Sequence, residues 1–375
     1  MSACRLCGAD LAPPILVLEG MPGAAQHLPT EDQLKNDIAQ NLGIQQCKGC
    51  GLAQVDCEPV SYYREVIRAI AFSEEMRAFR KAQLSSFAAR FGLAGKPVLE
   101  IGCGRGEYLE LLNEAGMRSH GTEHGKPSAD AASLAGFKVQ HVFPDSDGLK
   151  LDGAPFSAVF CFNFMEHWPQ PRAVLQCVVS NLGDSAVGLI EVPNFDMLIE
   201  KQMATEFVAD HLSYFTSATL RTALELSGFE VLEIQEVWYR YILSAVVRKR
   251  SPIAAEPFKK ALEAQRARVE NFIKQAGNNG VAIWGAGHQA LATMGLLRLG
   301  KSVRYVVDSA PFKQGRFTPA THIPIVPPEM LDKKPVDSIL IMAAGFSDEV
   351  ANIIKTRWGS RFRLAILRED HLEEL

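Results

Sequence analysis

The sequence has no long apolar run and no excess of charge of one sign. Its 375 residues include 39 Lys and Arg against 43 Asp and Glu, a formal net charge of -4. The absence of a basic field argues against a general nucleic-acid or anionic-membrane binder. Nearly apolar stretches such as 338–346 are far shorter than the roughly 18 residues of a membrane span. No apolar leader is visible near the N-terminus, so we expect a cytoplasmic protein.

Cysteine is also scarce, with eight residues in the whole chain, too few for a disulfide scaffold. Four of them form two Cys-x-x-Cys pairs, Cys4 with Cys7 and Cys47 with Cys50, and a glycine follows each pair. This pattern is typical of the tight turns that hold zinc. Four thiolates complete a tetrahedral site and leave no position for catalysis, so we predict structural Zn²⁺. Of the other cysteines, only Cys57 is near enough in sequence to compete as a ligand.

Two glycine-rich loops each follow a predicted strand. The first contains Gly102, Gly104 and Gly106 and leads from a short apolar strand into a helix. Glycines let the backbone approach a ligand closely, and a helix N-terminus offers free N–H groups. Glu100 precedes this loop inside the strand. Glu123 ends the next predicted strand, 21 residues after Gly102, where its carboxylate can accept hydrogen bonds from both hydroxyls of a ribose.

The second loop contains Gly285 and Gly287, and Asp308 lies 21 residues after Gly287 at the end of the following predicted strand. This spacing by itself is a dinucleotide-binding fingerprint, and it supports a rival function, an NAD-dependent oxidoreductase. Lys313 and Arg316 follow in a loop where they can contact a phosphate. A pair of solvated surface charges is the alternative interpretation.

The first loop resembles the opening motif of the class I S-adenosylmethionine (SAM) methyltransferases, an acidic strand end followed by Gly-x-Gly-x-Gly. The later elements agree: a strand at 156–164, the segment 165–169 that follows it, and a closing hairpin formed by 229–238 and 241–248. Such a hairpin inserts one antiparallel strand into an otherwise parallel sheet. The resemblance implies that SAM is bound by Glu100, Gly102, Gly104, Gly106, Glu123 and Asn163.

Nearly the whole chain resembles the bacterial sugar C-methyltransferases that act on nucleotide-linked 4-keto-6-deoxy sugars. The motifs that carry this resemblance are the two Cys pairs, the Glu-Val-Pro run 191–193, the His-Leu-Ser-Tyr-Phe run 211–215 and the segment 307–325. The resemblance implies an α/β fold in which a class I seven-stranded sheet is joined to two further domains. The implied domains are a zinc-binding domain at 1–72, a SAM-binding domain at 73–250, and a linker helix with a Rossmann-like domain at 251–375.

The same resemblance implies a catalytic histidine. His211 matches the last residue of a family run that reads Tyr-His-Glu-His, whereas this chain has Val-Ala-Asp-His, so the tyrosine is lost and the acid is shortened. An imidazole that titrates near neutral pH suits the removal of a proton from the acceptor. We expect His211 to be this base, with Asp210 or Glu166 fixing its tautomer.

Two further positions match active-site residues of the family. His167 falls on a second active-site histidine, and Tyr63 or its neighbour Tyr62 falls near a tyrosine from the N-terminal region. A histidine at this point can also merely shape the SAM pocket, and paired tyrosines can pack a domain junction. We take His167 and Tyr63 as candidate catalytic residues.

These observations predict a SAM-dependent methyltransferase that acts on a small acceptor, a nucleotide-linked deoxysugar, by C-methylation with a histidine base. Methylation of oxygen or nitrogen in another carbohydrate or natural product stays open, because the run before His211 departs from the family. The rivals from other classes are the NAD-dependent oxidoreductase and a non-catalytic zinc and nucleotide-binding protein. We expect no nucleic-acid or membrane partner, and a monomer or small homo-oligomer.

Overall fold

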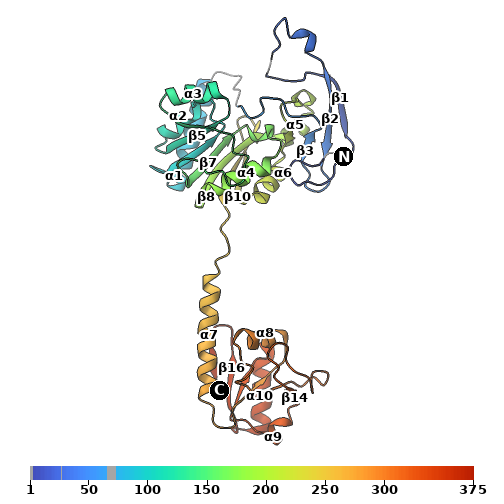
Figure 1. Cartoon of the computed structure of the whole chain (residues 1–375), viewed down its shortest axis with the longest axis vertical. Helices are drawn as coiled ribbons and strands as arrows, with labels where there is room; N and C mark the ends of the chain where they lie inside the picture. The colour runs from blue at the N-terminus through green and yellow to red at the C-terminus, as the bar shows by residue number, and fades with distance from the viewer. Residues whose placement is uncertain (1–2, 27, 66–72) are drawn as a thin grey trace. The chain divides into compact units, whose positions relative to one another are not determined.

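The computed structural model describes residues 3–26, 28–65 and 73–375, and the chain divides into two units, Met1–Ser251 and Pro252–Leu375 (Figure 1). The predicted boundary after residue 72 follows the segment 66–72, which is outside the described residues. The cysteine pairs and the first glycine loop belong to the same unit. Of the helices in the described part of the chain, none combines the length and the apolar character needed to cross a bilayer.

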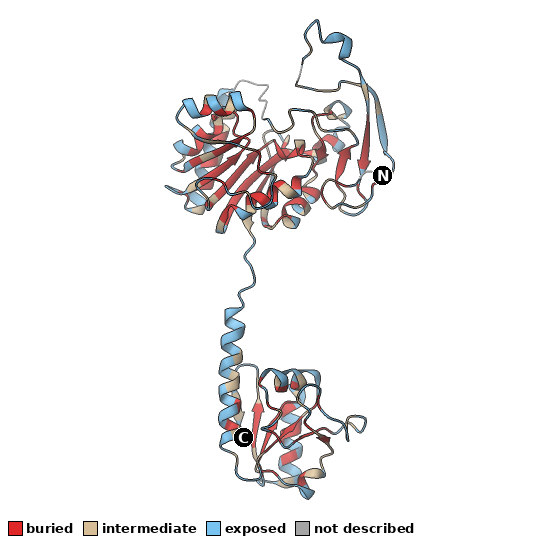
Figure 2. Cartoon of the chain, viewed as in Figure 1, coloured by how far each residue is buried: buried red, intermediate tan, exposed pale blue. Residues whose placement is uncertain are grey.

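The first unit is built on a seven-stranded sheet with the order β10-β11-β8-β7-β4-β5-β6. Neighbouring strands are parallel except around β11, which is antiparallel to both β8 and β10. This is the predicted class I sheet, including its one antiparallel strand, and Figure 2 shows that its central strands are buried. The strands are β4 (Pro97–Ile101), β5 (Arg118–Glu123), β6 (Lys138–His141), β7 (Phe156–Phe162), β8 (Leu182–Pro193), β10 (Phe229–Val237) and β11 (Ile242–Lys249).

Local signals explain where the helices of this unit begin and end. The Ser73 side chain accepts a hydrogen bond from the N–H of Met76 and caps α1, which ends at Gly92 in a left-handed conformation. Thr216 caps α6 in a reciprocal capping box with Thr219. The helices are α1 (Glu74–Phe91), α2 (Glu107–Glu114), α3 (Lys126–Leu134), α4 (Pro171–Ser180), α5 (Phe195–Glu200) and α6 (Ser217–Leu226), with 3-10 turns η1 (Leu34–Asn36), η2 (Met165–His167) and η3 (Ala204–Glu206).

A second, antiparallel sheet of four strands has the order β1-β2-β3-β9. Its strands are β1 (Leu16–Met21), β2 (Gln40–Gln46), β3 (Ala53–Val55) and β9 (Ser213–Tyr214). The strand β9 comes from the segment between β8 and α6, so the cysteine region, residues 3–65, is completed by residues from the region that forms the seven-stranded sheet. Both regions also share one hydrophobic core, in which Cys4 and Leu52 belong to the same cluster as Trp168 and Phe215.

The second unit has a six-stranded sheet with the order β14-β13-β12-β15-β16-β17, parallel except for the last strand. The apolar residues of α7 and α8 pack on one face and those of α9 and α10 on the other, which is a Rossmann-like arrangement. The elements are α7 (Glu256–Lys274), β12 (Val281–Trp284), α8 (His288–Leu296), β13 (Tyr305–Val307), β14 (Ile325–Val326), α9 (Met330–Lys333), β15 (Ser338–Ile341), η4 (Ala344–Phe346), α10 (Ser347–Trp358), β16 (Arg363–Leu367) and β17 (Leu372–Glu374).

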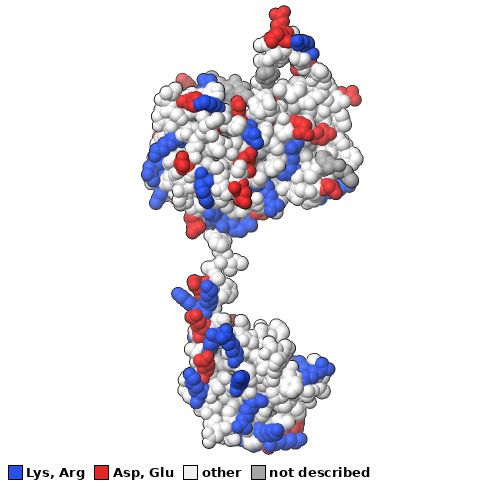
Figure 3. All heavy atoms as spheres, in the orientation of Figure 1, with Lys and Arg blue, Asp and Glu red and all other residues white. Residues whose placement is uncertain are grey.

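The predicted amphipathic linking helix is α7, which lies within the second unit. Its buried residues, Val269 and Phe272, are both in the C-terminal half, and Figure 2 shows the N-terminal half exposed. Positive and negative side chains are mixed along this helix in Figure 3. Such mixing is typical of a solvated helix surface.

Candidate active site

The first glycine loop connects β4 to α2, and its conformation requires glycine. Gly102, Gly104 and Gly106 all have positive φ, at 70°, 57° and 96°. A Cβ atom at Gly106 would lie 2.6 Å from Cδ2 of Phe137. The loop lies at the carboxyl edge of the sheet, where ligands bind in open α/β folds.

A buried carboxylate lies directly against this loop. Glu123 accepts a hydrogen bond from the N–H of Gly104 at 2.9 Å and another from the N–H of Gly125 at 2.7 Å. Glu100 is buried in the adjacent strand β4. An acidic residue held beside a glycine turn fits the ribose of SAM, and the chain thus brings the predicted loop and the predicted acid together.

Asn163 lies just beyond β7 on the same edge of the sheet. We predicted a strand at 156–164, but β7 ends at Phe162 and Asn163 has a left-handed conformation with φ of 47°. Its N–H donates to the carbonyl of Glu191, while the buried Oδ1 atom has no hydrogen-bond partner among the described residues. The strand ends early because the chain turns here toward η2, and the turn leaves this amide oxygen available to a ligand.

Three candidate catalytic side chains meet next to this edge. Glu166 and His167 are in η2, and His211 is in the segment that leads into β9; their ligand-type atoms all lie within 4.8 Å of one another. The two imidazole rings are edge to face with centroids 4.8 Å apart. The Nδ1 atom of His167 is 2.8 Å from the carbonyl oxygen of Asp210. Because a carbonyl only accepts, Nδ1 carries the proton and Nε2 has a lone pair.

Burial controls the protonation of this cluster. It lowers the pKa of His167, and together with the neighbouring His167 it lowers the pKa of His211 to about 3. The His211 imidazole therefore does not titrate near neutral pH, contrary to what we had expected of the base. Burial also raises the pKa of Glu166 to about 8. Both histidines are therefore neutral near pH 7, which is the form that accepts a proton, and Glu166 is largely a neutral acid.

Asp210 contributes to this site in a way that the sequence did not indicate. Its buried carboxylate accepts hydrogen bonds of 2.6 Å from the N–H of Ala25 and from the hydroxyl of Tyr62. The carboxylate is thus directed at these two donors rather than at His211, which we had expected it to orient. It is the main-chain carbonyl of Asp210 that contacts a candidate, His167.

The two adjacent tyrosines have different environments. The ring of Tyr63 packs edge-on against Phe143 and beneath the guanidinium group of Arg64. Tyr62 instead donates its hydroxyl to Asp210. The structure therefore connects Tyr62, and not the predicted Tyr63, to the catalytic cluster. Adjacent positions of one residue type give no sequence signal that would distinguish them.

The segment that carries His211 is fixed from both sides by Leu212. The N–H of Leu212 donates to the carbonyl of Glu166 at 2.9 Å, and its carbonyl accepts from the N–H of Val55 at 3.2 Å. The thiol of Cys57 contacts the carbonyl of Ala209. These contacts join His211 to η2 on one side and to the cysteine region on the other.

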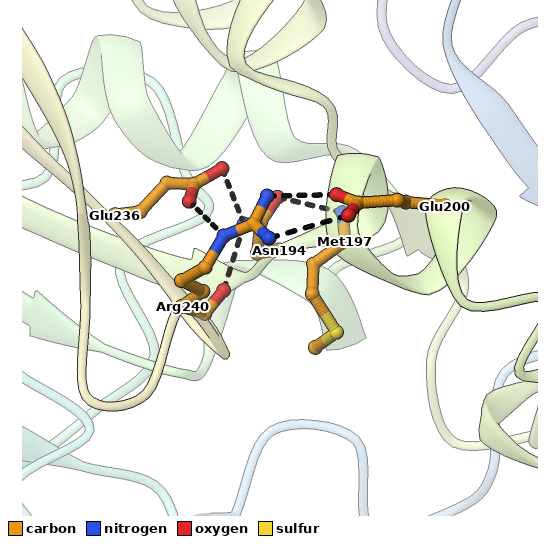
Figure 4. Close-up of polar contacts among 5 residues, drawn as sticks. All are labelled: Asn194, Met197, Glu200, Glu236 and Arg240. Atoms are coloured by element: carbon orange, nitrogen blue, oxygen red, sulfur yellow. Dashed lines mark hydrogen bonds and ion pairs between the residues drawn. The ribbon is translucent and has the colours of Figure 1, made fainter.

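The β10–β11 turn holds α5 in place (Figure 4). The Arg240 guanidinium group contacts Glu236 in β10 and Glu200 at the end of α5. The Asn194 side-chain amide donates to the carbonyl of Arg240, and its oxygen caps α5 by accepting from Met197. The turn therefore fixes α5, which precedes the loop that carries His211.

The four paired cysteines form a compact cluster. Their Sγ atoms all lie within 4.8 Å of one another, with 3.5 Å between Cys4 and Cys50 and between Cys7 and Cys47. In each pair the carbonyl of the first cysteine accepts the N–H of the following glycine, which has a left-handed conformation. Four sulfur donors converging from two such turns fit a tetrahedral metal ion. Cys57 does not belong to this group.

The second glycine loop, in the other unit, has its own internal contacts. The Asp308 carboxylate accepts from the N–H groups of Ala286 and Ala310 and forms an ion pair of 2.9 Å with Lys313. A cavity of about 760 Å³ lies beside this loop, and its lining includes Gln289 and Arg368 but not Asp308. Lys313, a candidate phosphate ligand, is thus already paired.

The seven-stranded sheet, the glycine loop and the acid that contacts it define the first unit as a SAM-dependent methyltransferase. Residues 74–234 match the family described as "Methyltransferase domain", and residues 250–366 match the "C-methyltransferase C-terminal domain". The "C-methyltransferase NovU" of Streptomyces niveus is 25% identical over 384 residues, which cover 92% of this chain and 90% of that protein. The chain is a SAM-dependent methyltransferase, and over most of its length it is similar to C-methyltransferases.

Other relatives match only the SAM-binding part. A "Ubiquinone biosynthesis O-methyltransferase" of Psychrobacter cryohalolentis is 30% identical over 118 residues, 29% of this chain and 46% of that protein. Among solved structures, a Haloferax volcanii complex of the Trm112 activator with a methyltransferase has a TM-score of 0.40 at 16% identity, covering 47% of this chain and 92% of that one. The SAH-bound magnesium protoporphyrin IX methyltransferase of Synechocystis PCC 6803 has a TM-score of 0.38 at 16% identity, covering 50% and 91%.

Proposed function

We propose that this enzyme methylates a carbon next to a ketone in a small acceptor, a nucleotide-linked deoxysugar, and that His211 removes the proton from that carbon. The observation that carries the proposal is the pair of half-buried, neutral imidazoles beside the carboxyl edge of the SAM-binding sheet. Similarity to C-methyltransferases over most of the chain supports carbon as the methylated atom. The class of acceptor rests on the resemblance to enzymes of nucleotide-linked sugars.

The first glycine loop would hold the cofactor. SAM supplies an electrophilic methyl group when it is bound. Glu123, which contacts the N–H of Gly104 in this loop, would accept the ribose hydroxyls. Holding the two reactants together can contribute roughly 7 to 11 kcal/mol toward lowering the barrier.

His211 is the better placed of the two histidines to act on the acceptor. The Nδ1–H group of His167 is committed to the Asp210 carbonyl, which fixes that ring. No described residue forms a hydrogen bond with the His211 ring, so its nitrogen atoms remain for the acceptor. Glu166 lies within 4.8 Å of both rings but is already protonated near pH 7, so the proton that leaves the acceptor would stay on His211 until solvent takes it.

Replacement of His211 tests the base directly. In His211→Asn, turnover should fall roughly 100-fold to 10,000-fold, the usual contribution of a positioned general base. SAM affinity measured by calorimetry should be unchanged, because the glycine loop does not involve the imidazole. With S-adenosylhomocysteine (SAH) in place of SAM, the wild type should exchange the proton of the acceptor carbon for deuterium and the variant should not.

Two results would redirect this proposal. A variant that turns over at nearly the wild-type rate would assign the base to His167. Methyl transfer without any deuterium exchange in the wild type would indicate an oxygen or nitrogen acceptor.

We also propose that the four paired cysteines bind one structural Zn²⁺. The double substitution Cys4→Ser and Cys47→Ser should remove about one zinc per chain in elemental analysis, because it leaves only two sulfur ligands. Cys57→Ser is the matched control and should retain the metal. Equal zinc content in both variants would exclude this site.

A further inference from the structure

The catalytic cluster contains one polar atom that the proposed reaction leaves unexplained. Glu166 is only 2% exposed, and its Oε2 atom has no hydrogen-bond partner among the described residues. Its Oε1 atom is 4.0 Å from Nε2 of His167, and a ligand-type nitrogen of His211 is within 4.8 Å of both side chains. A buried carboxyl oxygen without a hydrogen-bond partner is costly unless a ligand satisfies it, and an ion that binds here would displace the proton of Glu166.

We propose that Glu166, His167 and His211 form a second metal site, which takes a divalent transition-metal ion such as Zn²⁺, Co²⁺ or Ni²⁺. This donor set has two imidazole nitrogens and one carboxylate. It is chemically distinct from the four-sulfur cluster of Cys4, Cys7, Cys47 and Cys50. Imidazole and carboxylate donors suit these borderline ions, and three protein ligands leave coordination positions open.

The three side chains would have to move closer together to bind an ion. In a tetrahedral site with ligand distances of about 2.1 Å, neighbouring ligand atoms lie about 3.4 Å apart. The 4.0 Å between Glu166 and His167 would shorten by about 0.6 Å, and the separations within the 4.8 Å set by up to about 1.4 Å, which side-chain rotation can supply. His167 is already prepared as a ligand, because its Nδ1–H group donates to a carbonyl and leaves Nε2 directed at the cluster. Metal-binding histidines usually have such a second hydrogen bond.

Occupancy by a metal would block the acceptor, and this consequence rests on the proposed function. An ion bound by His211 removes the lone pair that the proposed base needs, and it fills the space between the two imidazoles. Divalent transition metals should therefore inhibit methyl transfer competitively with the acceptor and not with SAM.

A cobalt titration of the full chain, with zinc retained on the cysteines, tests the site without an activity measurement. Co²⁺ should bind as about one additional ion per chain and give visible d–d bands without a sulfur-to-cobalt charge-transfer band. Glu166→Gln and His167→Ala should each weaken this binding at least about tenfold, since even loss of a supporting residue costs 10-fold to 100-fold. Zinc content and SAM affinity should stay unchanged, which would show that the variants are folded.

His141→Ala is the matched control, because its exposed imidazole lies near that of His124 elsewhere in the same unit and should not affect the cobalt spectrum. Absence of sulfur-free cobalt binding in the wild type, or equal binding in all variants, would overturn the metal site. If cobalt binds at the cluster and methyl transfer is not slowed, the claim that the metal blocks the acceptor is wrong. The cobalt spectrum is measured without the acceptor. The metal site can therefore be tested even if the proposed acceptor is wrong.

Discussion

The two glycine loops have similar sequence patterns, and the structure shows that they are different features. In both, an acidic strand end lies 21 residues after a loop glycine, Glu123 after Gly102 and Asp308 after Gly287. The first loop has three glycines with positive φ. In the second loop, Gly285 has φ of 121° but Gly287 has an ordinary φ of -80°. The first loop thus needs glycine throughout, whereas the second needs it at one position.

Close packing requires glycine at one position of each loop, Gly106 against the side chain of Phe137 and Gly285 against backbone. A Cβ atom at Gly285 would lie 2.6 Å from the carbonyl oxygen of Met342 in the neighbouring strand connection, and a Cβ atom at Gly287 would meet nothing within 4 Å. Gly285 therefore serves packing within the second unit. The acid of that unit is also paired with Lys313, so a ribose would have to displace an ion pair. A spacing pattern alone cannot separate a cofactor loop from a packing turn.

The largest expected effect is the loss of SAM binding when one glycine of the first loop is replaced, compared with one of the second. Gly104→Val should abolish SAM binding in calorimetry, because a β-branched residue is strained at positive φ and would cover the loop. The matched variant Gly287→Val has an allowed φ and open space, and it should bind SAM normally. If Gly104→Val kept wild-type affinity, the assignment of the first loop to SAM would fail.

The two acids provide a second comparison. Glu123→Ala should weaken SAM binding by about 1.5 to 3 kcal/mol, the usual value of a hydrogen bond to a charged group. This corresponds to roughly 10-fold to 150-fold in the dissociation constant. Asp308→Ala should leave SAM affinity unchanged, since Asp308 belongs to the other unit. An equal loss in both variants would contradict the distinction between the loops.

The packing role of Gly285 is tested by stability. Gly285→Ala should lower the free energy of unfolding by about 1 to 3 kcal/mol, because the new methyl group clashes with backbone and φ stays positive. Gly295→Ala, in α8 with nothing within 4 Å of a Cβ atom, should raise it by up to about 1 kcal/mol. Urea denaturation measures both, and SAM affinity should change in neither. Stabilisation by Gly285→Ala would remove the packing argument.

The smallest effect comes from the ion pair of the second loop. Burial opposes the charged form of Asp308, but the Lys313 ammonium group and two N–H groups outweigh it and hold the pKa below its usual value. Because the pKa of Asp308 is lower in the folded protein than in the unfolded chain, the charged carboxylate stabilises the fold. This stabilisation is fully present above the ordinary aspartate pKa of about 3.9 and is lost as the pH falls through the pKa of the folded protein. At pH 6 the free energy of unfolding of the wild type should exceed that of Asp308→Asn by about 1 kcal/mol or less. The difference should disappear at acidic pH, where Asp308 is protonated. A difference that persists at acidic pH would exclude a contribution from the ion pair.

Much of the fold could be predicted from local patterns. The class I sheet could be predicted from the glycine turn, the cap at Thr216 and the closing hairpin. Each of these features depends on residues that are close together in the chain, so the sequence alone reveals it. The pairing of β3 with β9, the contact of Tyr62 with Asp210 and the ion pair between Asp308 and Lys313 were not predicted. These features depend on which residues face each other after folding. The periodicity of apolar residues in the sequence does not specify such pairings.

The short strand β9 also has a consequence for the order in which the protein is made. During synthesis, β1, β2 and β3 leave the ribosome long before Ser213 and Tyr214 exist, so β3 has an unpaired edge until most of the first unit has been translated. Unpaired strand edges are templates for association with other chains. A nascent chain that stops before Tyr214 would keep this edge open even with both cysteine pairs complete. Aggregation of such truncated chains should therefore end when translation passes residue 214.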